Sequence, residues 1–239
     1  MNYSKTIICL ANSRKLSGRC VAGKEIANQK IGNWIRPVSK RSTGELSHRD
    51  RCFSDSKDPC LLDVVTIEML KPQPDGFQTE NDLIDDTYWW TRVRSATHSE
   101  LRQALDHVDG DLWDNSSSSY NGRNDRIEEE QALVLASSLK LIEVSDLKIE
   151  ALIEGAEFGN PRRKVRGEFT LNDVSYRLSV TDPTVESEYA DGTHDIGRAI
   201  LCISLGEPYE GYAYKLIAGV IRVPEPAQAE FERKDPPQT

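Results

Sequence analysis

Apolar residues mostly recur at every second position or in short β-rich runs along this chain, and this pattern limits the possible folds more than any other property. Successive side chains of a β-strand point to opposite faces, so a period of two indicates strands with one buried face. Turn signals such as Asp75-Gly76, Asn172-Asp173 and Gly206-Glu207-Pro208 separate the runs. The pattern predicts barrels or sandwiches. We expect strands at residues 5–11, 19–25, 33–38, 61–70, 89–96, 133–142, 166–171, 174–181, 199–205 and 211–223.

One segment departs from the strand pattern. Thr97 and Glu100 have the spacing of a capping box, in which each residue caps the backbone of the other at a helix start. Apolar residues then follow at helical spacing: Leu101, Ala104, Leu105 and Val108. We expect this helix to close the open end of a barrel. The expected fold class is therefore mainly β, with one or two short helices.

The chain of 239 residues is long enough for two small domains, each with its own core. Residues 114–126 contain four consecutive serines and Asn121-Gly122 and show no apolar periodicity, which predicts a loop between two halves. We expect one barrel over residues 1–125 and a second over residues 126–224. Residues 225–239 are rich in Pro, Glu and Gln, and this composition predicts a disordered tail.

Charge is distributed unevenly along the chain. The first 60 residues carry 12 Lys and Arg against 5 Asp and Glu, whereas the remainder carries 18 against 34. A net charge of −9 opposes binding to a polyanion. A local basic segment still permits contact with a few phosphates. The alternative is a solvated basic hairpin without a ligand.

The basic segment contains the candidate ligand-binding residues. Gly18 and Gly23 permit close approach of a ligand to the backbone, and arginine can bind phosphate through two hydrogen bonds. If residues 19–25 form a strand, Arg19 and Lys24 lie on opposite faces, so the loop from Ser13 to Gly18 is the better candidate. The expected phosphate contacts from this segment are Ser13, Arg14, Lys15, Arg19 and Lys24.

Two further candidates lie on the next expected strand. Trp34 and Arg36 are two residues apart and would share a face, where they could form a stacking platform with a cation beside it. Stacking of a base on an aromatic ring contributes ~1–3 kcal/mol. The alternative is that Trp34 belongs to a barrel core and Arg36 pairs with a carboxylate. Lys215 is the last candidate, and Trp89 and Trp90 would point to opposite sides of a strand.

The five cysteines give no strong sign of a metal site or of disulfides. Cys9, Cys20 and Cys202 lie in apolar runs, where a free cysteine behaves as a small buried side chain. His48, Cys52 and Cys60 would need a fourth ligand and paired Cys-x-x-Cys motifs to resemble a zinc site. Without a leader-like segment or a run of about 20 apolar residues, we expect a cytoplasmic protein with no membrane contact.

Two enzyme hypotheses find little support. His194-Asp195 resembles the metal-binding dyad of the HD phosphohydrolases, but that chemistry needs a further histidine upstream and an aspartate downstream, both on helices. The aspartate that follows Asp195 is Asp235, in the expected tail. A nucleophile at Ser13 or Cys20 lies in no known motif, and no histidine is placed as its base.

Motifs at both ends of the chain resemble the prokaryotic dual OB-containing domain family. The N-terminal motifs are residues 8–15, 18–25 and 34–38, and the C-terminal ones are residues 181–183, 202–208 and 214–218. The resemblance spans about Lys5 to about Val223. It implies two oligonucleotide/oligosaccharide-binding barrels, and nucleic-acid binding is the expectation attached to that fold. It supplies no catalytic residue.

The leading hypothesis is a binding protein rather than an enzyme, with a nucleic acid or a nucleotide-like ligand contacted by residues 13–24, Trp34, Arg36 and Lys215. No cofactor or metal is expected. A second hypothesis is a protein-interaction adaptor in a prokaryotic multi-gene system, for example one of defence. A third is an enzyme acting on nucleotides or nucleic acid, with an active site that no local motif reveals.

Overall fold

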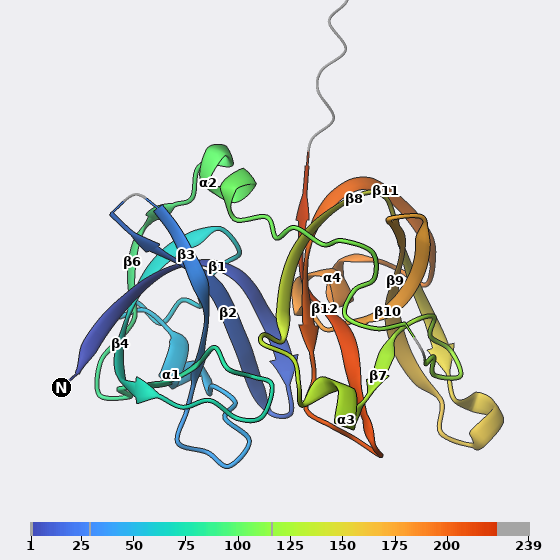
Figure 1. Cartoon of the computed structure of the whole chain (residues 1–239), viewed down its shortest axis with the longest axis horizontal. Coiled ribbons are helices and arrows are strands. Elements are labelled where there is room, and N and C mark those ends of the chain that lie inside the picture. Colours follow the sequence, from blue (N-terminus) through green and yellow to red (C-terminus); the bar gives the residue numbers. More distant parts are fainter. Residues whose placement is uncertain (1, 29, 116, 224–239) are drawn as a thin grey trace, which may run out of the picture.

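The computed structural model describes residues 2–28, 30–115 and 117–223, and the expected tail lies outside these residues. Two curled sheets of six strands each lie side by side (Figure 1). Residues 96–125, drawn in green, connect the two sheets. The expected division at residue 125 stays a prediction.

The first sheet closes into a barrel. Its order is β1-β2-β3-β5-β4-β6, and β1 also pairs with β4, so the first five strands form a closed ring. β3 and β5 are parallel, while the other neighbours are antiparallel. The strands are β1 (Tyr3–Lys15), β2 (Gly18–Ala27), β3 (Lys30–Val38), β4 (Asp63–Pro72), β5 (Asn81–Ile84) and β6 (Thr91–Ser95).

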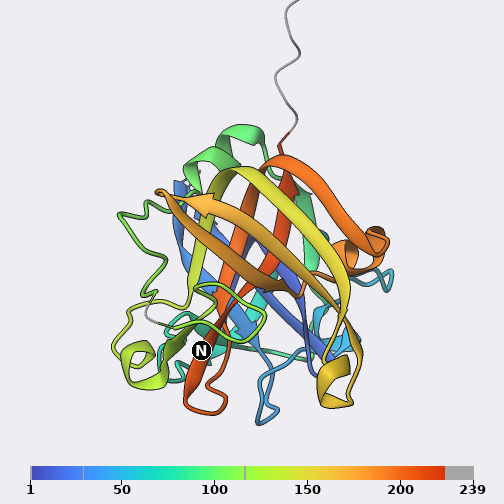
Figure 2. The same cartoon turned by 90° about the vertical axis from the view of Figure 1, so that its right-hand side faces the viewer.

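The second sheet repeats this connectivity. β8, β9, β10, β12 and β11 close in the same order, and the parallel pair is β10 with β12 (Figure 2). A short helix lies between the third and fourth strands of each barrel, α1 (His48–Arg51) and α4 (Pro183–Glu188). This is the five-stranded Greek-key barrel of the OB-fold, present twice. The strands are β7 (Arg126–Glu128), β8 (Leu139–Glu154), β9 (Arg162–Leu171), β10 (Val174–Val180), β11 (Gly192–Leu205) and β12 (Tyr212–Arg222).

The described residues form four hydrophobic clusters, and the three largest are the interiors of the two barrels and the core between them. β1 contributes to two of them because its side chains alternate: Ile7 and Cys9 lie in the first barrel, while Ile8 and Leu10 point outward. These outward residues are fully buried by the second barrel. The interior of the second barrel includes Leu147, Phe169, Tyr176 and Leu201. The core between the barrels includes Ile8, Leu10, Trp34, Leu141, Ile200, Cys202, Ala218 and Ile221.

The two barrels touch through their backbones as well as their side chains. The amide of Arg14 donates to the carbonyl of Thr181 at 2.7 Å. A Cβ atom added to Gly219 on β12 would lie 2.3 Å from the carbonyl oxygen of Leu10. Glycine is therefore required at this position by close approach rather than by an unusual backbone angle.

The predicted mainly β fold is confirmed, and so is the capping box that starts α2 (His98–Gln103). The expected role of this helix is wrong, because Leu101 and Ala104 pack into the core between the barrels rather than closing a barrel end. The strand expected at residues 133–142 begins at Leu139 and continues to Glu154, while Val134 is 84% exposed. Two other short helical segments are α3 (Glu129–Ala132) and η1 (Ala156–Phe158).

The Gly219→Ala variant tests the contact between barrels. The added methyl group collides with a carbonyl of the other barrel, so we expect the free energy of unfolding to fall by about 1–3 kcal/mol. Gly32→Ala is the control, since its Cβ would meet its nearest neighbour at an ordinary 3.4 Å. Chemical denaturation measures both. Equal stability of the two variants would contradict the close packing at Gly219.

Candidate ligand-binding cleft

The structure brings half of the predicted ligand-binding residues together in one cleft. Ser13, Arg14, Lys15 and Arg36 line a cavity of about 400 Å³ between the two barrels. Lys15 and Leu16, at the β1–β2 turn, line it together with residues 205–207 and Tyr209, at the β11–β12 loop. The remaining lining residues are Leu16, Cys20, Gln78, Thr181, Ser204, Leu205, Gly206, Glu207, Tyr209, Tyr214, Leu216 and Ala218.

The β1–β2 turn holds Arg14 and Lys15 at the edge of this cleft. Lys15 pairs with Gly18 in the ladder, so the turn itself consists of two residues, and Leu16 has a φ of 50°. A Cβ on Gly18 would lie 2.5 Å from the carbonyl oxygen of Leu46, which leaves no room for a side chain. Backbone hydrogen bonds between Arg19 and Leu46 then fix the hairpin.

Both cations at the edge of the cleft are paired with carboxylates of the second barrel. Arg14 donates to Glu186 through Nε at 3.1 Å and Nη2 at 2.6 Å. Lys15 lies 2.6 Å from Glu207. Exposed ion pairs of this kind contribute about 0–1 kcal/mol.

Arg36 lies at the inner wall of the cleft and is 2% exposed. It reaches from β3 to Ser138 at 2.8 Å and Ser204 at 3.2 Å, and it pairs with Glu80 at 3.2 Å. Its Nε has no hydrogen-bond partner among the described residues. Arg36 thus links the barrels and also places positive charge behind the cleft.

Two tyrosines of the cleft were not found from the sequence. Tyr209 is 65% exposed, and both it and Tyr214 line the cavity opposite the β1–β2 turn. No local pattern marked them, because Tyr209 precedes β12 and lies an odd number of residues from Tyr214.

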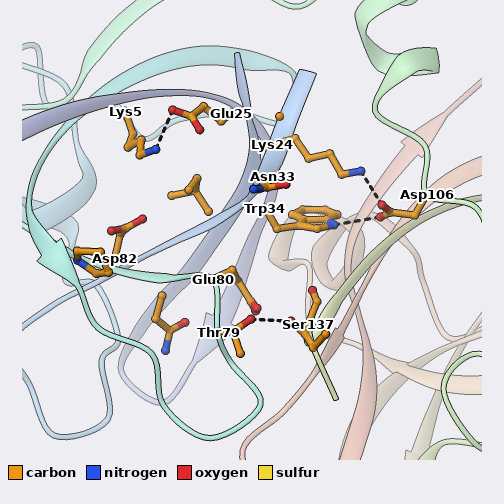
Figure 3. Close-up of a pocket in the computed structure, with 15 residues that line it drawn as sticks. Lys5, Lys24, Glu25, Asn33, Trp34, Thr79, Glu80, Asp82, Asp106 and Ser137 are labelled. Carbon is orange, nitrogen blue, oxygen red and sulfur yellow. Dashed lines mark hydrogen bonds and ion pairs between the residues drawn. The ribbon is translucent and has the colours of Figure 1, made fainter. Parts of the chain in front are cut away.

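Lys24 and Trp34 lie outside this cleft and share one partner, Asp106 (Figure 3). The Lys24 ammonium is 2.6 Å from Oδ1, and the Trp34 indole N–H donates to Oδ2 at 3.0 Å. Oδ2 also accepts from the amide of Leu141 at 2.7 Å. Trp34 is 8% exposed in the core between the barrels, so its ring is closed to stacking in this conformation.

Arg19 borders a separate cleft of about 510 Å³, which Asn12, Asp58, Asp182 and Arg222 also line. Arg19 is half-buried. Its backbone, rather than its side chain, carries the contacts with Leu46 described above. Arg19 thus lines a different cleft from Arg14 and Lys15, although Arg14 and Arg19 lie directly opposite each other in the β1–β2 ladder.

Lys215 is 1% exposed and serves an internal contact. Its ammonium donates to the carbonyl of Asp114 and, at 2.8 Å, to Oδ1 of Asn115. It also lies 5.4 Å from the centre of the Tyr176 ring. Burial lowers the pKa of Lys215 to about 8. This lysine fastens the connecting segment to the second barrel.

The motifs considered for metal binding have other contacts. His48 lies 3.0 Å from the carbonyl oxygen of Ser56, and Cys52 is buried. His194 and Asp195 are neighbours on β11, where adjacent side chains point to opposite faces, and His194 contacts the carbonyl of Ala190. Among the described residues, no three His, Cys, Asp or Glu side chains are grouped to hold a metal ion.

A second surface with aromatic and basic side chains lies on the second barrel. Tyr120 is 79% exposed and Phe158 is 71% exposed, and their rings meet edge to face at 5.6 Å. Phe158 belongs to the β8–β9 loop, and the exposed Arg162 and Lys164 begin β9. The sequence does contain a signal, because Phe158 is followed by the basic run Arg162-Arg163-Lys164. The net negative charge of residues 61–239 drew attention away from this run.

Two closed OB barrels in one chain, joined by a shared core, define a dual OB protein. The chain belongs to the dual OB-containing domain family, which it matches over residues 5–220. No curated protein matches it. Among solved structures, the crystal structure of the tetrameric p202 HIN2 matches with 8% identity over 90% of this chain and 87% of that chain, at a TM-score of 0.31. No helix in the described ranges is long and apolar enough to cross a membrane.

The buried position of Lys215 predicts a specific pH dependence. Between pH 8 and about 10.5 the unfolded chain keeps a proton on this lysine that the folded chain has lost, so this group makes the free energy of unfolding rise with pH. Relative to Lys215→Met, the wild type should gain about 3 kcal/mol across that range.

Denaturant titrations of both proteins at several pH values measure this difference. Burial raises the pKa of Cys9 and Cys202, which makes stability fall as pH rises, but these thiols are present in both proteins and cancel in the comparison. A difference that stays constant with pH would show that Lys215 is not buried as described.

Proposed function

We propose that the protein binds a nucleic acid or a nucleotide-like ligand in the cleft between its two barrels. The observation that carries the proposal is the convergence of Arg14 and Lys15 with Tyr209 and Tyr214 around one cavity. Cations for phosphate and aromatic rings for bases are the two components that single-stranded nucleic-acid sites combine. The two components come from different barrels, so the site depends on their association.

The ion pairs at the cleft leave its cations available to a ligand. Glu186 and Glu207 hold Arg14 and Lys15 in place, and the side chains of Arg14 and Lys15 are 52% and 21% exposed. A phosphate carries more charge than a carboxylate and presents several acceptor oxygens, so it competes well for these cations. The carboxylates then set the affinity by competing with phosphate.

The cavity of about 400 Å³ lies within the usual 300–1,000 Å³ range of small-ligand sites, which accommodates one nucleotide. A longer strand would reach beyond it. The exposed Tyr120 and Phe158 rings, with Arg162 and Lys164 nearby, offer a second place where unpaired bases can stack. We infer a preference for single strands, because bases in a duplex are not free to stack on side chains. Few phosphates would be neutralised, so salt dependence is modest.

Two double variants test this proposal: one removes positive charge from the cleft, and the other removes negative charge. Arg14→Ala/Lys15→Ala removes two phosphate contacts, so we expect affinity for single-stranded DNA or RNA to fall about 10- to 100-fold. Glu186→Gln/Glu207→Gln removes the competing carboxylates and should raise affinity several-fold. Fluorescence anisotropy with labelled single-stranded DNA, single-stranded RNA and duplex DNA, each with a salt titration, measures both effects.

Lys30→Ala/Lys71→Ala is the matched control, because it removes the same charge from exposed lysines outside the cleft. The salt slope should fall by about 1 for each phosphate interaction that Arg14→Ala/Lys15→Ala removes. If Arg14→Ala/Lys15→Ala and Lys30→Ala/Lys71→Ala lose the same affinity, general charge rather than the cleft governs binding. No binding of any of the three nucleic acids at low salt would refute the proposal.

The aromatic pair on the second barrel gives a separate prediction. Tyr120→Ala/Phe158→Ala should weaken binding of a long single strand by about 5- to 150-fold, because stacking contributes ~1–3 kcal/mol per base. Binding of a mononucleotide should be unchanged, because a mononucleotide fits within the cleft and does not reach Tyr120 or Phe158. Tyr88→Ala removes an aromatic ring that is 56% exposed on the first barrel and serves as the control. Weaker binding of both ligands would show a structural effect of the double variant.

One observation favours protein interaction as a second candidate function. Within the described residues β6 pairs with β4 alone, all five of its residues are exposed, and Val93 is 55% exposed. An edge strand of this kind can accept a strand from a partner protein. Trp89, 42% exposed beside it, would enlarge the contact. Failure of every nucleic acid to bind would favour this function.

A further inference from the structure

A polar cavity of about 530 Å³ is lined mainly by residues of the first barrel and lies apart from the cleft (Figure 3). β2 and β3 form its base, and residues 79–82 at the start of β5 form one wall. Asp106 and Ser137, from the segments before β8, also line it, and Thr79 donates a hydrogen bond to the carbonyl of Ala136 beside Ser137 at 2.6 Å. The second barrel covers a neighbouring part of β2 and β3, and the cavity lies where these strands stay uncovered.

The charges of the cavity disfavour an anionic ligand. Its two lysines are already paired, Lys5 with Glu25 at 2.8 Å and Lys24 with Asp106 at 2.6 Å. Glu80 and Asp82 bring the carboxylates in the lining to four, and Arg36 behind the wall offsets one of them. A phosphate would therefore meet a net negative lining without an unpaired cation. A cation would find each carboxylate engaged by a lysine, an arginine or, for Asp82, the Tyr3 hydroxyl.

The hydrogen-bonding groups of the cavity favour hydroxyls. Each lysine ammonium has three donors and makes one ion-pair contact here, so further donors are available. Asn33 is exposed at the cavity and offers an amide with both a donor and an acceptor. Asn81 also lines the cavity, is 5% exposed, and its Oδ1 has no hydrogen-bond partner among the described residues. Donors and acceptors are thus interspersed, and a hydroxyl group both donates and accepts.

We propose that this cavity binds an uncharged polyhydroxylated ring, either the ribose of a nucleoside or a neutral sugar. Carboxylates next to a cavity commonly accept hydrogen bonds from ring hydroxyls, as an acidic residue does from ribose in dinucleotide sites. The volume suits a ligand of one or two rings. This site is distinct from the cleft, because the two share no lining residue, although Arg36 of the cleft pairs with Glu80 of the cavity at 3.2 Å.

Nuclear magnetic resonance on the full chain can test the site locally. The probes are uridine, glucose, uridine 5′-monophosphate and spermidine. The readouts are the resonances of the side-chain amides of Asn33 and Asn81 and of the indole N–H of Trp34, three residues that line the cavity. We expect uridine or glucose to shift these resonances, and which of them does so identifies the source of the ring. The monophosphate should bind here about tenfold or more weakly than uridine.

Asn33→Ala should weaken binding of the neutral probe at least about fivefold, since it removes a hydrogen-bonding amide. Lys30→Ala, an exposed change on the same strand outside the cavity, should leave binding unchanged. If neither neutral probe shifts these resonances at millimolar concentration, the proposal is overturned. So would equal or tighter binding of the monophosphate or of spermidine, or wild-type affinity in Asn33→Ala. None of these outcomes bears on nucleic-acid binding in the cleft.

Discussion

The packing of the outer face of β1 and β2 against β8, β11 and β12 determines most of what this molecule can do. Ile8 and Leu10 are fully buried there, and the absent side chain of Gly219 lets the two backbones approach. The face of an OB barrel that commonly binds ligands is that of its second and third strands. In the first barrel the second barrel covers part of this face. What remains is the open cavity beside Trp34 and the cleft at the β1–β2 turn.

The charge asymmetry of the sequence follows from the same packing. Cations from the basic N-terminal segment meet acids from the rest of the chain: Lys24 meets Asp106, Arg14 meets Glu186, and Lys15 meets Glu207. The three pairs differ in solvent exposure, and this difference separates their roles. The Lys24 side chain is 9% exposed and holds the connecting segment, whereas that of Arg14 is 52% exposed and can exchange its partner for a ligand.

Sequence periodicity was sufficient for most of the strands and for the mainly β class, and residue spacing for the capping box of α2, because these depend on local alternation and short-range spacing. Periodicity did not predict β5, and the two barrels followed from the family resemblance. The unbroken apolar run from Ile7 to Ala11 indicates that both faces of β1 are buried, but it could not show that another barrel covers the outer face. Likewise, the helical spacing around Leu101 could not distinguish a barrel end from the core between the barrels. Ser13, Arg14 and Lys15 were found together because one turn places them. Tyr209 and Tyr214 join them through contacts about 200 residues away in sequence, which no local pattern encodes.

Cooperative unfolding of the two barrels is the central claim that a single measurement can test. The measurement is hydrogen exchange of backbone amides in β4 and in β9 during titration with denaturant. If the core between the barrels holds them as one unit, amides of both strands should lose protection at the same denaturant concentration and with the same free energy. Exchange of one barrel while the other stays protected would contradict the account, because each barrel would then be stable without the shared core.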